Sequence, residues 1–267
     1  MPGRLWLLPV PLGADSDPQQ ILPAETLAVM RRLDCFIVEH AKTARAFLKA
    51  AGVSTPLQAL ELHELNEHTP AARIPELLAP LAAGRDVGLL SEAGCPAVAD
   101  PGADLVAAAH AAGIAVKPMV GPSSILLALM ASGLGGQRFS FSGYLPTVPA
   151  ERLAALRALE QRSARDDETV LLIETPYRNQ ALIEAALQAL APGTRLLIAA
   201  SLTLPDERIE MKTVAQWRRT PPSLPKVPIV FGLRAEARGS AARRPAAPAA
   251  ADGVPGPARR SGPRGRS

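Results

Sequence analysis

The sequence predicts an α/β protein built as two lobes, each a sheet covered by helices. Two observations carry this prediction. Short apolar runs alternate with helical patterns along residues 1–234, and most of these runs are apolar throughout. Strands of that kind are buried on both faces, which is typical of mostly parallel sheets covered by helices. The 267 residues are 48% hydrophobic, which is enough for a packed core, and a break after Val120 divides the strands into two groups.

The expected elements follow in order along these residues. The strands cover 5–10, 35–38, 57–62, 86–90, 115–120, 139–144, 169–174, 195–201 and 226–233. Helical patterns lie between them, among them 25–33, 42–52, 72–84, 103–113 and 177–190. Several of these patterns end in glycine, which is a common helix stop. Nine strands in two groups predict two sheets.

The chain divides into a first lobe over residues 1–120, a second over 121–234 and a tail over 235–267. The tail consists mainly of Ala, Pro, Gly and Arg without apolar periodicity, so we expect it to be disordered. The tail carries seven Arg, one Glu and one Asp, a net charge of +5. Residues 1–234 therefore hold 22 basic and 23 acidic residues, a net charge of −1. The basic character of the chain therefore belongs to the tail. Its arginines could touch RNA, although a solvated extension explains them as well.

Cysteine content and hydropathy predict a soluble protein of the cytoplasm. The only cysteines are Cys35 and Cys95, which fits a reducing compartment and excludes a disulfide scaffold and a structural zinc site. The apolar run over 5–12 is short, is interrupted by Pro9 and Pro11 and leads into acidic residues, which argues against a signal peptide. No apolar stretch approaches the ~20 residues that cross a bilayer.

A loop of small and rigid residues follows the expected strand 86–90. Its sequence, SEAGCPAVADPG at 91–102, holds two prolines and two glycines, Gly94 and Gly102. Glycine lets a ligand approach the main chain and permits positive φ, whereas proline fixes its own φ and restricts the residue before it. We expect a stiff loop with exposed carbonyl and amide groups. It lies beyond the carboxyl end of a buried strand, where open α/β sheets bind ligands.

A second small-residue turn, VGPSSIL at 120–126, follows the next strand and opens a helix. Ser123 and Ser124 fit the N-cap or first turn of that helix, where hydroxyls and free amides are available. Two consecutive strands would then present ligand-competent loops at one edge of the sheet. Two ordinary connecting turns are the alternative, but the length, proline spacing and adjacency of the loops favour a small-molecule site.

These segments together resemble a known family. SEAGCPAVADPGADL, GPSSILLALMASG and ETPYR are similar to motifs of the tetrapyrrole-methylase-like superfamily of S-adenosylmethionine (SAM) methyltransferases. The resemblance is closest to the bacterial ribosomal small-subunit RNA methyltransferase I group, which methylates a cytidine 2′-hydroxyl. Members typically read SDAGTPGISDPG at 91–102, HEHNE at 63–67, TPIGN at VPLGA and ESPHR at ETPYR. The five motifs stand in order, and the similarity covers residues from about 5 to 233 without the tail.

The resemblance implies a mostly parallel N-terminal sheet, a mixed C-terminal sheet, SAM folded in a cleft between the two lobes, and a homodimer. It also implies methyl transfer to ribosomal RNA of the small subunit. The residues themselves predict no membrane and no metal. Carried onto this sequence, the cofactor-binding residues would be Pro11, Gly13, Ser91, Glu92, Ala93, Gly94, Val98, Asp100, Gly121, Pro122, Ser123, Ser124, Ala200 and Leu202.

Three departures from the family pattern concern charged residues. The family's EDTR segment appears as EHAK at 39–42, its ARELTK segment as AASLTL at 199–204, and Ala14 replaces an Asn. The glycines and prolines on the cofactor side are kept, whereas charged residues expected to face the substrate are changed. Three functions therefore stay open: methylation of ribosomal RNA, methylation of a tetrapyrrole or other small molecule, and SAM binding without catalysis.

Methyl transfer to a hydroxyl needs in-line alignment, exclusion of water and a group that accepts the hydroxyl proton. His63 is the leading candidate for this base, because histidine ordinarily titrates near neutral pH. We place it with Asn66 and Glu67 just past the third strand. The alternative is a polar loop in which Asn66 or Thr69 caps the next helix. Glu39 ends the second strand, where its carboxylate could meet substrate or His63, or could cap a helix.

The remaining candidates are a metal site and two arginines. His63 and His68 are five positions apart, which places them about 140° apart around a helix, so they cannot share a metal and we expect none. Arg45, one turn into its helix, could contact a phosphate or be an ordinary surface residue. Arg178 could bind substrate, or it could pair with Glu174 and brace the second lobe.

Overall fold

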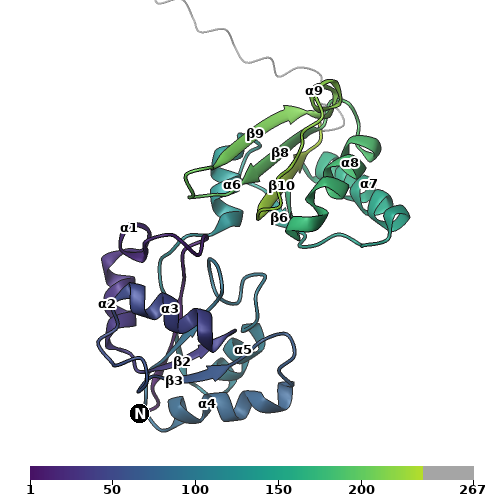
Figure 1. The fold of residues 1–267 in the computed structure, drawn as a ribbon. Coiled ribbons are helices and arrows are strands. Elements are labelled where there is room, and N and C mark those ends of the chain that lie inside the picture. Colours follow the sequence, from purple (N-terminus) through teal and green to yellow (C-terminus); the bar gives the residue numbers. More distant parts are fainter. Residues whose placement is uncertain (237–267) are drawn as a thin grey trace, which may run out of the picture. The chain divides into compact units, whose positions relative to one another are not determined.

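The computed structural model describes residues 1–236 and contains two five-stranded sheets (Figure 1). The N-terminal sheet has the strand order β3-β2-β4-β1-β5, and every neighbouring pair is parallel. Its strands are β1 (Arg4–Leu8), β2 (Cys35–Val38), β3 (Glu61–Glu64), β4 (Val87–Leu90) and β5 (Ala115–Pro118). The expected parallel sheet is confirmed.

The C-terminal sheet has the order β6-β7-β10-β8-β9 and is mixed, as expected. Only the β6–β7 pair is parallel, and the other three pairs are antiparallel. The strands are β6 (Phe139–Phe141), β7 (Thr169–Glu174), β8 (Arg195–Ala200), β9 (Arg208–Thr213) and β10 (Ile229–Arg234).

Nine α-helices and two short 3-10 helices lie among the described residues. The α-helices are α1 (Pro18–Ile21), α2 (Ala24–Arg32), α3 (Ala41–Ala51), α4 (Ile74–Ala82), α5 (Ala103–Ala111), α6 (Ser124–Ser132), α7 (Pro149–Asp166), α8 (Asn179–Ala189) and α9 (Val214–Arg219). The 3-10 helices cover Ala71–Arg73 and Pro176–Arg178. Local sequence explains several ends: Gly52 stops α3 at a φ of 77°, and Ser123 caps α6. No helix among residues 1–236 is long and apolar enough to cross a membrane.

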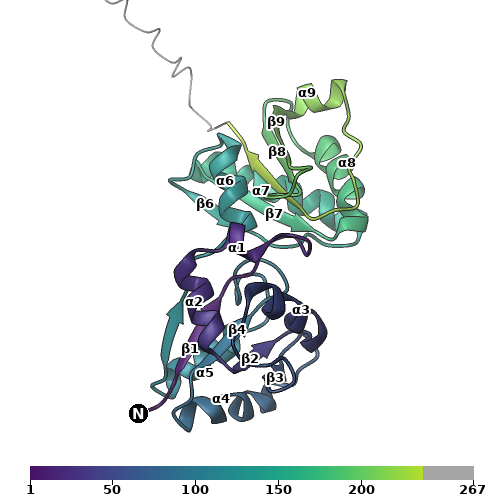
Figure 2. The same cartoon turned by 60° about the vertical axis from the view of Figure 1, so that its left-hand side comes forward.

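The N-terminal sheet is covered on both faces, which explains why its strands are apolar throughout (Figures 1 and 2). In β2, Phe36 and Val38 pack in one cluster with residues of α2 and α3. Cys35 and Ile37 point to the opposite face and pack with residues of α4 and α5. Successive side chains of a strand alternate between faces, so a strand buried on both faces has no polar side.

The C-terminal sheet is also covered on both faces. Its larger cluster joins Leu172 and Phe231 to helices α7, α8 and α9, where Trp217 is buried and donates its indole N–H to the Leu196 carbonyl at 3.0 Å. The opposite face packs against α6 through Ala128. Both sheets therefore give their connecting loops a rigid base.

Several details differ from the sequence prediction. The expected strand 57–62 is wrong in position, because residues 57–59 form a turn and β3 begins at Glu61. The structure has one strand more than the nine predicted, and the additional strand is β9. It is an edge strand whose polar residues alternate with apolar ones, and charges on such an edge hide a strand from an apolar-run search. Three expected strands end early: the strand at 5–10 ends at Leu8, that at 115–120 at Pro118 and that at 139–144 at Phe141. The strand expected at 226–233 begins at Ile229.

The expected division at residue 120 stays a prediction. The expected tail lies outside the described residues except for Ala235 and Glu236. Ala235 is buried, and its amide donates to the Ser163 hydroxyl at 3.0 Å.

Candidate active site

The loop at 91–102, which we call the β4 loop, is fixed to the chain that follows β1. Val10 and Gly94 exchange both main-chain hydrogen bonds, at 2.9 and 3.1 Å, and the Ser91 hydroxyl also donates to the Gly94 carbonyl. The expectation of freely exposed polar groups is therefore wrong at Gly94, because its amide and carbonyl are already paired. The expectation of a stiff loop fits this pairing.

Four residues of the β4 loop have positive φ. They include Gly94 at 74° and Gly102 at 126°, which accept this conformation readily, and also Ala97 at 63° and Ala99 at 60°. A left-handed conformation costs a residue with a Cβ about 1–2 kcal/mol. Strain of this kind clusters at ligand-binding and catalytic sites, because the surrounding structure must hold it in place.

The turn after β5 lies directly against the β4 loop, so the predicted adjacency of the two loops is confirmed. The Cys95 thiol contacts the Pro122 carbonyl at 3.4 Å. A Cβ on Gly121 would lie only 2.3 Å from the Pro9 Cβ, so only glycine fits there. Ser123 is the N-cap of α6, as predicted, and its hydroxyl accepts a hydrogen bond from the Leu126 amide at 3.5 Å.

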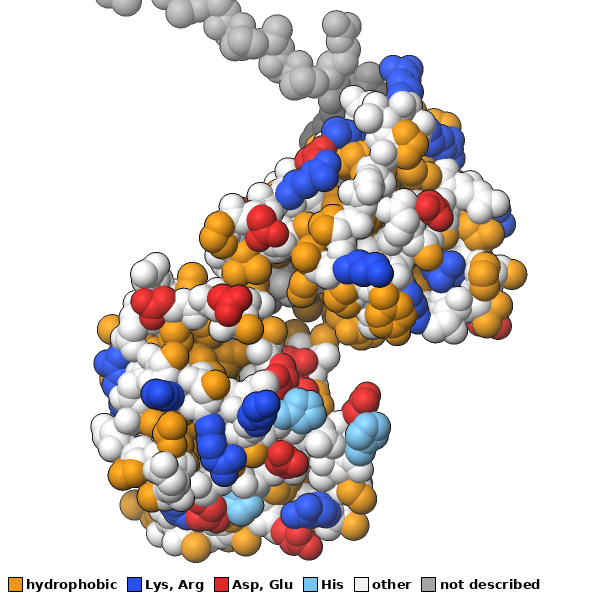
Figure 3. All heavy atoms as spheres, in the orientation of Figure 1, with side chains coloured by type: hydrophobic (Ala, Val, Ile, Leu, Met, Phe, Trp, Pro, Cys, Tyr) orange, Lys and Arg blue, Asp and Glu red, His pale blue; other side chains and the backbone are white. Residues whose placement is uncertain are grey.

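Three carboxylates gather at this edge of the sheet. Glu39 accepts a hydrogen bond from the Glu92 amide at 3.2 Å, and Glu92 accepts one from the Thr43 hydroxyl at 2.6 Å. Asp100 accepts none within residues 1–236. Burial, together with the negative charges of Glu39 and Glu92, raises the pKa of Asp100 to about 7. Burial also raises the pKa of Glu39. Figure 3 shows acidic and histidine side chains close together beside α3.

Three pockets open around these loops, and each contains predicted site residues. The apolar pocket, of about 300 Å³, is lined by Leu12, Ala93, Ser124, Tyr144, Ile173, Glu174, Thr175, Pro176, Ala199, Ser201, Leu202, Leu204, Pro228, Ile229 and Val230. The α3 pocket, of about 220 Å³, includes Pro11, Gly13, Ser91, Glu92 and Thr43. The Asp100 pocket, of about 630 Å³, includes Asp100, Asn66, Glu67, Ala97 and Ala99. The other predicted cofactor residues belong to the same segments.

His63 lies inside β3, so its predicted position just past the strand is wrong. Its Nε2 is 2.7 Å from the Glu61 carboxylate, which also pairs with Arg85. Arg85 in turn binds Asp34 at 3.0 Å. Asp34 and Glu61 lie at the amino ends of β2 and β3. The three clustered carboxylates instead follow the carboxyl ends of β2 and β4, at the opposite edge of the sheet. The catalytic role of His63 stays a prediction.

His63 also belongs to a cluster of metal-ligand types. Ligand atoms of Cys35, Glu61 and His63 lie within 4.8 Å of one another. Burial raises the pKa of the Cys35 thiol to about 11, which opposes the thiolate that metals prefer. The expectation of no metal site stays a prediction.

Asn66 and Thr69 close a turn on each other instead of capping a helix, so the capping alternative is wrong. The Asn66 amide donates to the Thr69 hydroxyl at 2.9 Å, and the Asn66 side chain accepts from the His68 amide at 3.1 Å. The capping role proposed for Glu39 belongs to Glu64, which accepts a hydrogen bond from the first amide of α3, that of Ala41. Glu67 lines the Asp100 pocket beside this turn.

The two arginines have different surroundings. Arg45 is exposed, and its only side-chain hydrogen bond within residues 1–236 goes to the Ala41 carbonyl of its own helix, at 3.5 Å. Arg178 pairs with the buried carboxylate of Glu174 at 2.6 Å and donates to the Leu145 carbonyl at 3.1 Å. The predicted bracing pair is therefore present. A substrate contact for either arginine stays a prediction.

The sequence reasoning missed several residues that line the apolar pocket. Tyr144, Thr175 and Ser201 line it with hydroxyl groups. Ser201 has a φ of 50° and the nearby Thr203 a φ of 69°, so the segment after β8 is strained like the β4 loop. The polar signal here is weak, because single hydroxyl residues within apolar segments are common in ordinary turns.

Comparisons with known proteins identify the family. The family model for Tetrapyrrole (Corrin/Porphyrin) Methylases matches residues 16–217. The chain belongs to this family. It is therefore a methyltransferase, and the resemblance seen in its motifs is confirmed.

The curated relatives include proteins named ribosomal RNA small subunit methyltransferase I. That of Synechocystis sp. is 33% identical over 218 residues, which cover 82% of this chain and 71% of the relative. That of Xylella fastidiosa is 37% identical over 177 residues, 66% of this chain and 60% of the relative. That of Escherichia coli O157:H7 is 32% identical over 214 residues, 80% of this chain and 70% of the relative.

Solved structures show the same fold. The methyltransferase CobJ matches with a TM-score of 0.57 and 19% identity, over 87% of this chain and 94% of that one. Uroporphyrin-III-C-methyltransferase from Thermus thermophilus matches with a TM-score of 0.52 and 23% identity, over 88% and 93%. The expected two-sheet α/β architecture of tetrapyrrole methylases is confirmed.

Proposed function

We propose that this protein transfers a methyl group from SAM to ribosomal RNA of the small subunit, at a cytidine 2′-hydroxyl. The observation that carries the proposal is the strained β4 loop, coupled to the turn after β5, beside the partly buried carboxylate of Asp100. The names of the curated relatives support the RNA acceptor. A location in the cytoplasm and a homodimer belong to the same proposal.

The residues around the loops fit the chemistry of SAM. The apolar pocket offers a surface for an adenine ring together with the hydroxyls of Ser124, Thr175 and Ser201. A Cβ on Gly13 would lie 2.3 Å from a Leu204 methyl group, so the main chain of the first loop is closely packed there. Glu39 and Glu92 would suit the positive charges of SAM. When bound, SAM supplies an electrophilic methyl group on a cationic sulfur.

Asp100 is the residue of this chain best placed to accept the proton of the acceptor hydroxyl. It lines a pocket of about 630 Å³, which lies within the usual range for small-molecule and nucleotide sites. A base works best when its pKa lies near the working pH, and the pKa of Asp100 is raised to about 7. His63 instead contacts Glu61. We therefore assign the proton to the Asp100 carboxylate and leave Asn66 and Glu67 to orient the acceptor.

The remaining task of the chain is to hold its loops rigid and keep water away. The Val10–Gly94 and Cys95–Pro122 contacts fix the β4 loop before any ligand arrives. Such preorganisation lets binding energy serve alignment instead of ordering the loop. Leu12, Ile173 and Leu202 supply apolar walls that exclude water from the apolar pocket.

A small-molecule acceptor is the second candidate, and the three clustered carboxylates favour it. Glu39, Glu92 and Asp100 repel the phosphates of an RNA strand, so RNA would need cations from elsewhere in the chain. Both acceptors predict the same use of SAM and the same base.

Two measurements test the proposal. Calorimetry of the full chain should show binding of SAM and of S-adenosylhomocysteine, and its absence would remove the proposal. Labelled methyl transfer from SAM to small ribosomal subunits purified from a strain lacking this protein should label the RNA. Labelling of a low-molecular-weight fraction alone would support the small-molecule acceptor instead.

A further inference from the structure

The two tyrosines of this chain have an unusual position. The chain has only nine aromatic residues: five Phe, two Trp and two Tyr. Both tryptophans, Phe36 and Phe231 are buried, whereas Tyr144 and Tyr177 are 56% and 72% exposed. Aromatic rings are large apolar groups, and leaving most of both tyrosines in water forgoes much of the burial energy that they could give the fold. Their exposure therefore needs another explanation.

Both tyrosines stand beside the apolar pocket. Tyr144 lines it directly, and Tyr177 follows Thr175 and Pro176, which line the same pocket. Arg178 joins the two positions, because its guanidinium donates to the carbonyl of Leu145, the residue after Tyr144. The same guanidinium pairs with Glu174 in the strand that leads to Tyr177. The two rings are thus carried by backbone segments joined by one hydrogen bond.

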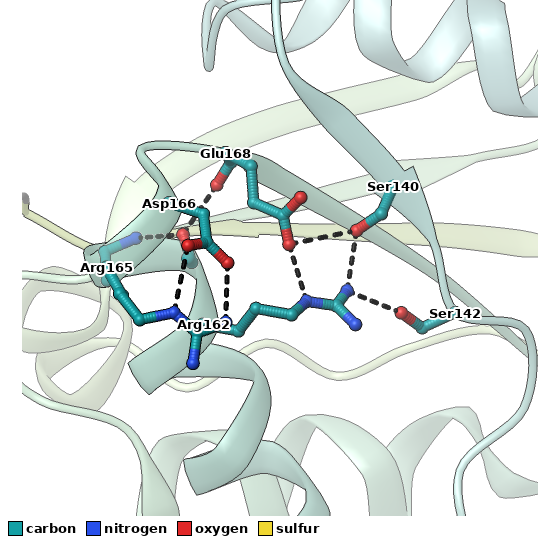
Figure 4. Close-up of polar contacts among 8 residues, drawn as sticks. Ser140, Ser142, Arg162, Arg165, Asp166 and Glu168 are labelled. Carbon is teal, nitrogen blue, oxygen red and sulfur yellow. Dashed lines mark hydrogen bonds and ion pairs between the residues drawn. The ribbon is translucent and has the colours of Figure 1, made fainter.

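The segment before Tyr144 is also held firmly (Figure 4). Arg162 of α7 donates to the Ser140 hydroxyl at 2.6 Å and to the Ser142 hydroxyl at 3.0 Å, and it pairs with Glu168 at 2.5 Å. The Gly143 carbonyl accepts a hydrogen bond from the Ile173 amide at 3.1 Å. The backbone under Tyr144 is therefore fixed before a ligand binds, which reduces the entropy lost on binding.

We propose that Tyr144 and Tyr177 form a stacking platform for unpaired nucleobases of the RNA strand that carries the methyl acceptor. This inference rests on the proposed function. Exposed aromatic rings recognise single-stranded RNA because every base has a flat π-face, and bases splayed out of a helix stack on such rings. Hydrophobic and cationic side chains lie next to one another on the surface of the C-terminal half in Figure 3.

The platform also resolves an electrostatic difficulty. The carboxylates at the β4 loop repel phosphates, so the acceptor strand cannot be held there by charge alone. Stacking holds bases without requiring phosphate contacts. Burial raises the pKa of the Tyr144 phenol, and the negative charges of Asp100 and Glu174 raise it further, so this ring stays neutral.

The test measures binding of a short single-stranded RNA to the full chain, with Tyr144→Ala and Tyr177→Ala as variants. Each should weaken binding about 5- to 150-fold, the range for the loss of one stacked base. Tyr144→Phe and Tyr177→Phe keep the ring and should bind within about twofold of the unmodified protein. Phe139→Ala is the matched control, because Phe139 is also exposed, at 42%, but lies in edge strand β6 outside the apolar pocket.

Two further arms separate the possible outcomes. An abasic version of the same RNA keeps the phosphates and should bind the unmodified protein and both alanine variants equally weakly. Alanine variants that bind the intact RNA as well as the unmodified protein does would overturn the platform. So would an unmodified protein that binds no single-stranded RNA. Calorimetry with SAM and methyl transfer report separately on the proposed function, because both are measured with the unmodified protein.

Discussion

Replacing Asp100 with Asn should stabilise the fold at neutral and alkaline pH. The Asp100 carboxyl is partly buried and accepts no hydrogen bond within residues 1–236, so the fold prefers its protonated form. Its pKa rises from the ordinary value of 3.8 to about 7. Each tenfold change in proton affinity is ~1.36 kcal/mol, so this rise corresponds to at most about 4 kcal/mol.

The sign of the pH dependence follows from proton linkage. Below pH 3.8 the carboxyl is protonated in both the folded and the unfolded chain, so Asp100 does not lower the free energy of unfolding. Between that pH and about 7 the unfolded chain releases its proton while the folded chain keeps it, so stability falls as pH rises. Asn cannot ionise. The gain from Asp100→Asn should therefore grow from near zero at about pH 4 to as much as about 4 kcal/mol at about pH 8.

The assay is urea unfolding of the full chain and of the variant at both pH values. Asp104→Asn is the matched control, because Asp104 also lines the Asp100 pocket but is exposed in the first turn of α5. Its effect should stay within about 0.5 kcal/mol at both pH values. A gain from Asp100→Asn that is equal at the two pH values would refute the raised pKa of this partly buried carboxyl, and with it the choice of Asp100 as the base.

Four more results are expected. In a pH–rate profile, the rate of methyl transfer should rise about tenfold per pH unit below pH 7 and level off above it. Glu39→Gln removes a negative charge that raises the pKa of Asp100, so it should move the midpoint of this profile to lower pH. Gly94→Val should abolish SAM binding in calorimetry, because the φ of Gly94 is 74° and an added Cβ would lie 3.2 Å from the Leu12 side chain. The control is Gly113→Ala, which should bind SAM normally, because Gly113 has a similar φ of 69° but has open space around it. Arg178→Ala should lower stability by about 3–5 kcal/mol in thermal unfolding, because it leaves the buried Glu174 carboxylate without its positive partner. A second change, Glu174→Gln, removes that buried charge and should recover much of the loss. His63→Ala should leave kcat within about threefold of normal, because a base would cost at least about a hundredfold.

The sequence predicted the architecture because burial on both faces leaves a visible trace. Strands such as β2 and β4 are apolar at every position, and glycine marks the end of α3. The same reasoning placed the two loops and the cap at Ser123, because turn and cap chemistry is local. These features depend on residues close together in sequence, so a single chain suffices to find them.

The missed features depend on register and on distant contacts. Placing the third strand too early put His63 in a loop, whereas in β3 its side chain meets Glu61, two residues back on the same face. The positive φ values of Ala97 and Ala99 leave no mark in the sequence, because alanine is ordinary in helices and turns alike. The raised pKa of Asp100 depends on its burial and on the charges of Glu39 and Glu92, groups that a one-dimensional pattern does not bring together.

The separation of the two sheets along the chain has a consequence for synthesis. All strands of the N-terminal sheet lie before residue 119, and those of the C-terminal sheet begin at residue 139. The first sheet can therefore assemble on the ribosome while the second is still being translated. Its slowest step should be the pairing of Leu5 with Val116, because β5 is the last strand of this sheet to emerge and this pairing spans the longest stretch of chain. Until β5 has emerged, one edge of β1 in the nascent chain lacks its partner strand.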